Sequence, residues 1–523
     1  MIGWSVYDNV GLTKLRNRSD PFRFSSLQRL MAYELYDWQQ AHASKLAFAL
    51  DTHRVALDAS DMGTGKTVIA CKVAKEAGLL PIVICPKSVI PNWKETIAEE
   101  YGYDCESELS ELIYNYEKLT RVRDNRIKII ERMVERGRPS YRWRLDPKKV
   151  VLIFDEVHRC KGSNSLNGKL LYKAKEQGFR ILMLSATAFA TPLDMKSIGY
   201  ALGLHGYRDY WTWCLSHGCS KSHFGGLRYA ESSGANRKIH DQVFTDMKSG
   251  SRISIRELPE GSFPDNIVVA QSYTIEEDFK LDFIASEIGR WMRLRPMQGR
   301  VFPNDSTNPL VELLRARQEA ELTKVPVLCE LAHDAYLQGK SPVVFVNFRD
   351  TMVAVKKLLW DRGVEDNILS IYGDQLGMER EAVVEFFNGF PNQIMVAMIQ
   401  AGGVGLSLHD VRGDSPRVSI ISPGFSAIEL RQALGRIHRA GGKSVALQYV
   451  VFADGTVEDH VRRRVQKKLN NLDLLNDGDL QEPFLDYYEK YTKPIESMDL
   501  PDYVQEADDP YSPTVIQEST EET

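Results

Sequence analysis

The stretch Ser60–Thr67 holds the residue types that bind a polyphosphate. Gly63 and Gly65 allow backbone N–H groups to turn toward phosphate oxygens, and the N-terminus of a following helix adds partial positive charge at the same place. Lys66 can reach the β- and γ-phosphates, and the Thr67 hydroxyl can ligate Mg²⁺. Ser60 stands where the strict pattern has glycine. We interpret the stretch as a phosphate-binding loop; the alternative is a chance glycine turn before a helix.

Two adjacent carboxylates, Asp155 and Glu156, follow the β-branched run Val150–Phe154, which predicts a buried parallel strand. Adjacent carboxylates at the end of a buried strand are costly without a cation. Bound Mg²⁺ would remove that cost, held by Asp155 directly or through water. Glu156 would then point at the water that attacks the γ-phosphate.

A third group of polar residues lies in Gln432–Arg439, which we predict to be one helix. Gln432, Arg436 and Arg439 are spaced i, i+4 and i+7, so one face of such a helix presents all three. Two arginines and a glutamine on one face make an anion-recognition surface. The alternative is a solvent-exposed helix with surface salt bridges.

These groups need strands and helices that place them. Apolar runs predict strands at 55–57, 81–85, 113–117, 150–154 and 181–184, and a second α/β unit with strands at 342–346, 368–371, 394–397 and 418–422. The hydroxyls of Ser185–Thr187 end one strand of the first unit and can sense the γ-phosphate. Upstream, Gln39 follows Tyr36 and Trp38; an aromatic ring can stack on adenine while the glutamine bonds its edge. The alternative is a helix start with a buried Tyr and Trp.

Composition bounds the class of protein. A chain of 523 residues is too long for one core and suggests two to four domains. The net charge of −5 gives no global basic bias, and seven scattered cysteines without a signal peptide predict a reducing compartment, cytoplasmic or nuclear. No apolar run is long enough to span a bilayer. The stretch from Lys118 to Lys149 contains twelve Lys and Arg but only four Asp and Glu. This basic stretch is either a track for nucleic acid or a solvated face.

Residues 205–300 break the strand–helix rhythm and contain Trp211, Trp213, Cys214, His217, Cys219 and His223. A zinc site is conceivable, but the spacing matches no common zinc pattern, and we favour an aromatic-rich insertion with its own small core. From Asp502 to Thr523 there are seven acids and no base, which predicts a disordered acidic tail.

The ordered set of motifs resembles a motor of helicase superfamily two. The set comprises Gln39, Gly63–Thr67, Cys85-Pro86, Asp155–His158, Ser185–Thr187, Gly402–Leu406 and Gln432–Arg439. Finer features resemble the Swi/Snf-like DNA translocase branch: Ile84–Pro86, Asn92–Glu95, Asn115–Glu117 and Gly455–Glu458. The insertion, with Tyr210, Trp213-Cys214, Gly226 and Arg256–Pro259, is similar to the annealing-helicase subgroup. Ser185–Thr187 and Ser407 depart from the branch, which usually has Thr-Gly-Thr-Pro and Asn there.

The resemblance implies an α/β fold with two RecA-like domains built on parallel sheets. The expected division is an N-terminal arm at 1–30, ATP-binding domain 1 at 31–204, the insertion and linker at 205–324, helicase C-terminal domain 2 at 325–475, and the acidic tail at 476–523. ATP and Mg²⁺ would bind between the two domains. The residues expected to contact ATP are Gln39, Gly63, Thr64, Gly65, Lys66, Thr67 and Gly405. Thr67 and Asp155 would bind Mg²⁺. The residues expected to act in catalysis are Lys66, Asp155, Glu156, Gln432, Arg436 and Arg439.

The same resemblance implies a DNA-stimulated ATPase that moves along duplex DNA through backbone phosphates, remodelling protein–DNA complexes or reannealing strands. A strand-separating DNA or RNA helicase is the alternative, and a non-enzymatic ATP-binding module is a third. The presence of Lys66, Glu156 and Arg439 argues against the third. A protein partner held by the insertion or by the acidic tail is a further expectation.

Overall fold

The computed structural model describes residues 34–103, 106–120, 129–135, 138–161, 165–222, 225–229, 233–273, 309–364, 367–373, 375, 377–402, 406–453, 458, 461–463 and 465–469. Several predicted features lie outside these residues, among them the N-terminal arm at 1–30, Gly405 and the acidic tail at 476–523. Within the described part, no helix combines the length and apolar character that crossing a membrane requires.

The first domain is built on a six-stranded parallel sheet in the order β10-β1-β7-β6-β2-β3. Its strands are β1 (Val55–Asp58), β2 (Leu80–Cys85), β3 (Ile113–Asn115), β6 (Val150–Asp155), β7 (Arg180–Leu184) and β10 (Gly250–Ser251). The central strands are buried along almost their whole length, as their β-branched runs predict. Because β1, β7 and β6 are neighbours, the segments that follow these three strands meet at one edge of the sheet.

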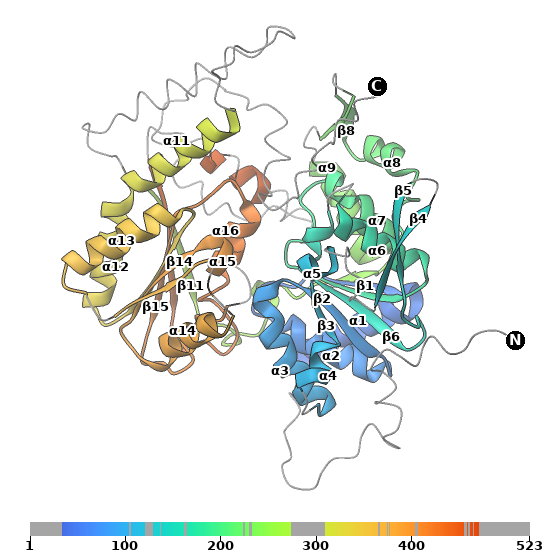
Figure 1. The fold of residues 1–523 in the computed structure, drawn as a ribbon, viewed down its shortest axis with the longest axis horizontal. Coiled ribbons are helices and arrows are strands. Elements are labelled where there is room, and N and C mark those ends of the chain that lie inside the picture. Colours follow the sequence, from blue (N-terminus) through green and yellow to red (C-terminus); the bar gives the residue numbers. More distant parts are fainter. Residues whose placement is uncertain are drawn as a thin grey trace, which may run out of the picture.

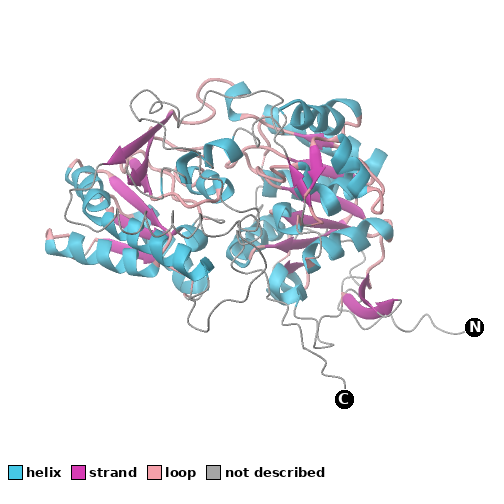
Figure 2. Ribbon diagram, turned by 90° about the horizontal axis from the view of Figure 1, so that it is seen from above, coloured by secondary structure: helices cyan, strands magenta, loops and turns pink. Residues whose placement is uncertain are grey.

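Helices connect these strands and cover the sheet (Figures 1 and 2). They are α1 (Asp37–His53), α2 (Lys66–Glu76), α3 (Ile90–Tyr101), α4 (Glu106–Ser110), α5 (Tyr116–Thr120), α6 (Leu166–Glu176) and α7 (Met195–Leu202), with short 3₁₀ turns at Lys87–Val89, Val157–Cys160 and Pro192–Asp194. A parallel sheet of this kind needs crossover helices, and the chain supplies them between successive strands.

The second domain has its own six-stranded parallel sheet, in the order β11-β16-β15-β12-β14-β13. Its strands are β11 (Asn266–Tyr273), β12 (Ser341–Val346), β13 (Ile368–Ile371), β14 (Ile394–Met398), β15 (Arg417–Ile421) and β16 (Ala446–Ala453). Alternate residues of β12 enter opposite cores, Val343 and Phe345 on one face and Val344 and Val346 on the other. The predicted fold class, two parallel-sheet α/β domains, is therefore confirmed.

Six helices of the second domain are α11 (Pro309–Thr323), α12 (Val325–Leu337), α13 (Arg349–Asp361), α14 (Gly377–Gly389), α15 (Ile399–Gly402) and α16 (Ala427–Leu434). The two faces of the sheet are covered separately, because α12 and α13 line one core while α16 lines the other. Figure 1 shows α15 and α16 on the side of this domain that faces the first domain.

The segment that we predicted as insertion and linker contributes to both sheets. Strand β10 pairs with β1 of the first sheet, and β11 pairs along its whole length with β16 of the second. Between 205 and 249 lie α8 (Tyr210–Ser216), β8 (Cys219–Lys221), β9 (Leu227–Tyr229), α9 (Ser233–His240) and a π-helical turn, η6 (Asp241–Asp246).

The aromatic and cysteine side chains of the insertion pack onto the first domain. Trp213, Cys214 and Cys219 are buried in a cluster that is continuous with the core of the first sheet, so the predicted separate core is wrong. His217 stacks on Trp213 with ring centroids 4.3 Å apart, and its Nδ1 lies 2.8 Å from the Trp213 carbonyl oxygen. Among the described residues, no three His, Cys, Asp or Glu side chains are arranged to hold a metal, and His223 lies outside them.

The basic stretch forms an antiparallel hairpin of β4 (Ile130–Glu135) and β5 (Arg138–Trp143). Trp143 is buried, and its Nε1 donates to the Leu170 carbonyl over 3.0 Å, so this ring is a core residue. Arg142 is exposed but lies directly across the hairpin from Glu131, which offsets its charge. Figure 1 shows β4 and β5 on the side of the first domain away from the second, and Arg136 lies outside the described residues.

Candidate active site

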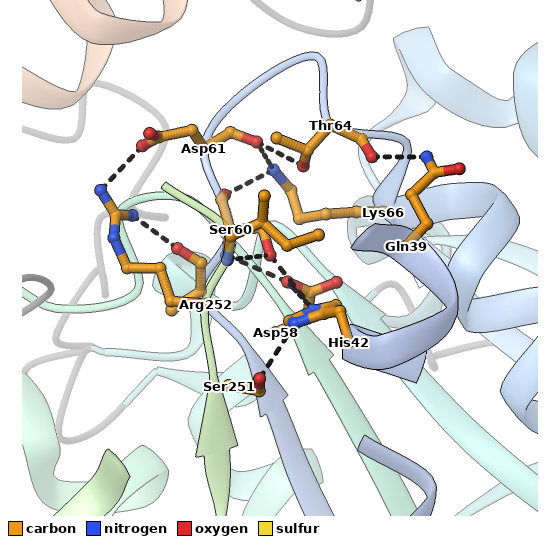
Figure 3. Close-up of polar contacts among 11 residues, drawn as sticks. Gln39, His42, Asp58, Ser60, Asp61, Thr64, Lys66, Ser251 and Arg252 are labelled. Atoms are coloured by element: carbon orange, nitrogen blue, oxygen red, sulfur yellow. Dashed lines mark hydrogen bonds and ion pairs between the residues drawn. The ribbon is translucent and has the colours of Figure 1, made fainter. Parts of the chain in front are cut away.

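The phosphate loop joins β1 to α2 as predicted, and its glycines have backbone angles that favour glycine. Gly63 and Gly65 have φ of 80° and 87°, and Gly65 is the N-cap of α2. Lys66 Nζ turns into the loop and donates to the carbonyls of Ser60 and Asp61, each over 2.8 Å (Figure 3). The ammonium group is thus held at the centre of the turn, which suits a polyphosphate beside the helix N-terminus.

Gln39 contacts this loop. Its side-chain Nε2 donates to the Thr64 carbonyl over 2.9 Å, and its Oε1 accepts from the Tyr36 backbone N–H over 3.0 Å. A Cβ added to Gly65 would lie 2.5 Å from Gln39 Nε2, so Gly65 is also needed for this close approach. Tyr36 is 58 % exposed and stacks on Trp38 with centroids 5.4 Å apart. Gln39 therefore braces the loop, and its contact with adenine stays a prediction.

Asp155 ends β6, and both its carboxylate oxygens have partners. Trp93 Nε1 donates to Oδ2 over 2.8 Å, and the Glu156 backbone N–H donates to Oδ1 over 2.9 Å. Burial, together with the neighbouring charge of Glu156, raises the pKa of Asp155. A cation at this position would lower that pKa again, which is the chemistry expected of a metal-binding carboxylate.

Glu156 has a left-handed backbone, with φ of 52°, which is uncommon for a residue with a side chain. Its Oε2 lies 3.2 Å from His158 Nδ1 and accepts from Ser185 Oγ over 3.3 Å. Burial by itself would raise the pKa of Glu156, but the contact with His158 and the charges of Lys66 and Arg436 lower it. Glu156 is therefore held ionised beside Asp155. The hydrogen bond from Ser185 to Glu156 is a contact that the sequence analysis did not predict.

The candidate magnesium ligands fit an ion that is bound mainly by phosphate and water. Thr67 lies in the first turn of α2, and its Oγ1 accepts from Asn92 Nδ2 over 3.3 Å. Mg²⁺ usually takes only one or two carboxylates from the protein and keeps several waters. One hydroxyl and one carboxylate, Thr67 and Asp155, would suffice for that mode.

The helix that we predicted over Gln432–Arg439 is shorter than expected: α16 ends at Leu434, and the prediction is wrong from Gly435 onward. A shared helical face therefore does not explain how the two arginines meet the loop. Arg436 Nε donates to the Gln432 carbonyl over 2.8 Å, and its Nη1 donates to the Leu406 carbonyl over 3.1 Å. Arg439 Nε donates to the Gly435 carbonyl, and its Nη1 donates to Ser407 Oγ over 2.7 Å.

Arg439 lies against the phosphate loop of the first domain, and the charge of Arg436 acts on Glu156. A Cβ added to Gly63 would lie 3.0 Å from Arg439 Cγ, and one added to Gly435 would lie 2.8 Å from Met62 Cβ. Arg436 is 3 % exposed. Burial and the charge of Arg439 lower the pKa of Arg436 to about 9, while the charge of Glu156 acts in the opposite direction and raises it. Gln432 is buried as well, and its Nε2 finds no hydrogen-bond partner in the part of the chain that the structure describes. The buried guanidinium group of Arg436 and the partly buried one of Arg439 thus add positive charge from the second domain to this site.

Beneath the loop lies a buried polar network that the sequence analysis missed. His42 of α1 has Nε2 3.1 Å from Asp58 Oδ1 and 3.2 Å from Ser60 Oγ, and Nδ1 2.9 Å from Ser251 Oγ (Figure 3). Burial would raise the pKa of Asp58, but His42 and Lys66 lower it. The hydroxyl of Ser60, at the position where the strict pattern has glycine, also accepts from the Ile253 N–H over 2.9 Å.

We expect His42→Ala to lower the free energy of unfolding by about 3 kcal/mol, because it removes the imidazole that contacts Oδ1 of the fully buried Asp58 carboxylate. Urea unfolding followed by circular dichroism would measure this. His53→Ala, at the last turn of the same helix, is the control and should change stability by about 0.5 kcal/mol or less. A loss below about 1 kcal/mol in His42→Ala would show that Asp58 is solvated or paired otherwise.

Comparison with known proteins indicates the family to which the chain belongs. Residues 32–190 match the family "type III restriction enzyme, res subunit", and residues 323–441 match the helicase conserved C-terminal domain. A putative ATP-dependent RNA helicase, L364 of Acanthamoeba polyphaga mimivirus, is 33 % identical over 487 residues, covering 88 % of this chain and 87 % of the relative. The CHD3-type chromatin-remodeling factor CHR7 of Arabidopsis thaliana is 20 % identical, and the match covers 87 % of this chain and 38 % of the length of CHR7.

Among solved structures, the Sulfolobus solfataricus SWI2/SNF2 ATPase core in complex with dsDNA is 16 % identical, covers 87 % of this chain and 96 % of that one, and has a TM-score of 0.33. The chain belongs to helicase superfamily two and is Swi/Snf-like. It is an ATP-hydrolysing, helicase-like enzyme and a nucleic-acid motor of that family.

Proposed function

We propose that the protein hydrolyses Mg²⁺-bound ATP between its two domains and uses the cycle to translocate on duplex DNA, remodelling protein–DNA complexes or reannealing strands. One observation carries the ATP part of the proposal. Arg439 of the second domain packs on Gly63 of the phosphate loop, and Arg436 lies within the electrostatic reach of Glu156. Residues far apart in sequence thus form one anion site.

Each residue has a role in this proposal. Lys66 leaves the loop carbonyls to contact the β- and γ-phosphates, and the loop amides from Gly63 to Thr67 bind the remaining oxygens. Glu156, kept ionised by His158, accepts a proton from the attacking water and orients it. Arg436 and Arg439 neutralise charge that develops on the transferred phosphoryl group, and Gln432 lies beside them.

Mg²⁺, when bound, would neutralise charge on the phosphates, and Thr67 and Asp155 are the residues that would hold it. Ser185 links the catalytic carboxylate to the neighbouring strand, because its Oγ contacts Glu156 and accepts from the Thr187 N–H over 3.1 Å. A change at the γ-phosphate can therefore be passed to the segment after β7.

The domain contact supports a motor cycle. Met62 of the loop meets Gly435, and Arg439 meets Gly63, so the arginines reach the loop only while the domains are closed. Loss of the γ-phosphate removes the anion between them and favours opening. If each domain grips the DNA backbone, repeated closing moves the protein along the duplex. The relative named as a chromatin-remodeling factor supports a DNA substrate, whereas the mimivirus relative is named as an RNA helicase.

We expect duplex DNA to raise the ATPase rate of the purified protein severalfold. The stimulation should fade as salt increases, because each phosphate contact releases a counterion; the logarithm of affinity should fall by about 0.9 per contact for each unit of log salt. Steady-state ATPase rates with duplex DNA, single-stranded DNA, forked DNA and duplex RNA, measured side by side between low and moderate salt, test this.

The outcomes separate the alternatives. Stimulation by RNA and not by DNA would contradict the proposal, and separation of forked strands would favour the strand-separating alternative. Lys66→Ala is the negative control for contaminating ATPase.

Charge reversal of Arg136, Arg138, Arg142 and Arg144 should weaken stimulation of the ATPase by DNA if the hairpin is a DNA track. Unchanged DNA affinity would show that the hairpin is a solvated face. A protein partner at the insertion or at the acidic tail remains part of the proposal.

A further inference from the structure

The segment Ser249–Ile255, which lies within the predicted insertion and linker (205–324) and includes β10, runs alongside the phosphate loop. Backbone N–H groups of Leu57, Ala59 and Asp61 donate to the carbonyls of Ser249, Ser251 and Ile253, over 2.9, 2.9 and 3.0 Å. The ladder between β1 and β10 thus continues beyond both strands and into the loop. The loop is therefore built partly by a segment that lies about 190 residues later in the chain.

Arg252 binds the loop at two points on either side of Ser60. Its Nη1 donates to the Ala59 carbonyl over 2.7 Å, and its Nη2 lies 2.8 Å from Asp61 Oδ1 (Figure 3). The Arg252 side chain is only 9 % exposed. The other carboxylate oxygen of Asp61 accepts from the Ile255 N–H over 3.0 Å. One guanidinium group thereby sets the course of the backbone between Ala59 and Asp61.

The same piece of backbone holds Lys66. The carbonyls that accept from Lys66 Nζ belong to Ser60 and Asp61, the residues that Arg252 brackets. Arg431 of α16, in the second domain, is among the charges that act on Asp61. Burial would raise the pKa of Asp61, but Arg252, the Ile255 N–H and Arg431 lower it, so the carboxylate stays ionised. Met62, the next residue, meets Gly435 of the second domain.

We propose that Arg252 is a positioning residue of the ATP site: through Asp61 and the Ala59 carbonyl it holds the phosphate loop in the shape that directs Lys66 at the phosphates. This inference rests on the ATP site of the proposed function but needs no nucleic acid. It also means that the shape of the loop depends on the docking of Ser249–Ile255. A ligand that moves residues 205–248, the part of the insertion that precedes this segment, can thereby change the affinity for ATP.

The test uses the full chain without nucleic acid. In Arg252→Ala, the KM for ATP and the dissociation constant of a fluorescent ATP analogue should rise about tenfold or more, as for a lost hydrogen bond to a charged group, while kcat changes less. Arg252→Lys should recover part of the affinity, because lysine keeps the charge beside Asp61 but lacks the planar fork. Arg256→Ala, an exposed arginine four residues on, is the matched control and should leave KM unchanged.

A purely structural ion pair predicts a different result. It would lower the melting temperature of Arg252→Ala but leave KM within about twofold of the parent, a change below 0.5 kcal/mol, and that result would overturn the proposal. If Arg252→Ala does not fold, Asp61→Asn replaces it, since it keeps the oxygen that accepts from the Ile255 N–H but removes the charge; it should raise KM in the same way, and an unchanged KM would overturn the proposal.

Hydrogen exchange supplies a second readout. Binding of a non-hydrolysable ATP analogue should slow exchange of the Asp61, Ile253 and Ile255 amides in the parent and much less in Arg252→Ala. No slowing in the parent would contradict the coupling. Failure of duplex DNA to stimulate the ATPase would leave these results untouched, whereas normal ATP binding by Lys66→Ala would show that the ATP site itself is wrongly assigned.

Discussion

Glu156→Gln should reduce ATP turnover by at least about a hundredfold, the lower end of the range for a lost general base. The substitution keeps the size of the side chain and an oxygen for the contact with Ser185, so the fold should persist. It removes the charge that accepts the proton, and ATP should therefore bind and remain uncleaved. Single-turnover hydrolysis, together with retention of labelled ATP on the protein, measures both effects.

Two further variants should be compared with Glu156→Gln, one that loses nucleotide binding and one control. Lys66→Ala should also abolish turnover, but by weakening nucleotide binding, because it removes the ammonium group at the centre of the loop. Glu176→Gln, on the exposed surface of α6, should behave like the parent. Turnover by either Glu156→Gln or Lys66→Ala above that of a mock preparation would sink the assignment of the site.

Arg439→Ala is expected to cost at least about a hundredfold in nucleic-acid-stimulated turnover, a conservative floor under the 10³–10⁵ that an arginine finger supplies. The physical reason is the position of its side chain on Gly63, where phosphate charge would develop. Binding of ATP and of DNA should persist. Arg439→Lys should also be poor, because a lysine keeps the charge but not the planar fork that holds Ser407 Oγ.

Arg436→Ala should lose turnover to a similar extent, and it should lose stability too, since Arg436 is buried and bonds the carbonyls of Gln432 and Leu406. Melting temperatures separate the two effects. Arg412→Ala is the matched control, because Arg412 forms an exposed ion pair with Asp414, which is worth about 1 kcal/mol or less. Turnover of Arg439→Ala within about threefold of the parent, under 1 kcal/mol in barrier, would mean that the second domain does not complete the site.

The local parts of the site could be predicted because they depend on near neighbours in the chain. Runs such as Val150–Phe154 form strands since β-branched residues favour a buried sheet, and β6 indeed ends at Asp155. The glycines at 63 and 65 predict a turn with positive φ, which the backbone shows. The consecutive strands also indicated two α/β units. In each case the cause acts within about ten residues of its effect, which is the range that pattern reasoning covers.

The helix around Gln432 shows where local spacing misled. An i, i+4, i+7 pattern predicts one helical face through Arg439, but α16 stops at Leu434. Gly435 then packs against Met62 of the other domain, where a Cβ would clash. Close approach of two domains decided the end of this helix, and helical periodicity does not carry that information.

By itself, the sequence determined the phosphate loop, the carboxylate pair at the end of β6 and the succession of strands, because these follow from the conformational preferences of adjacent residues. Only the tertiary structure decided which distant groups complete the site. Arg252 meets Asp61, and Ser251 meets His42, across 191 and 209 positions of the chain. Those contacts exist because β10 pairs with β1, and strand order is set by the packing of the whole sheet, which no short stretch of sequence encodes.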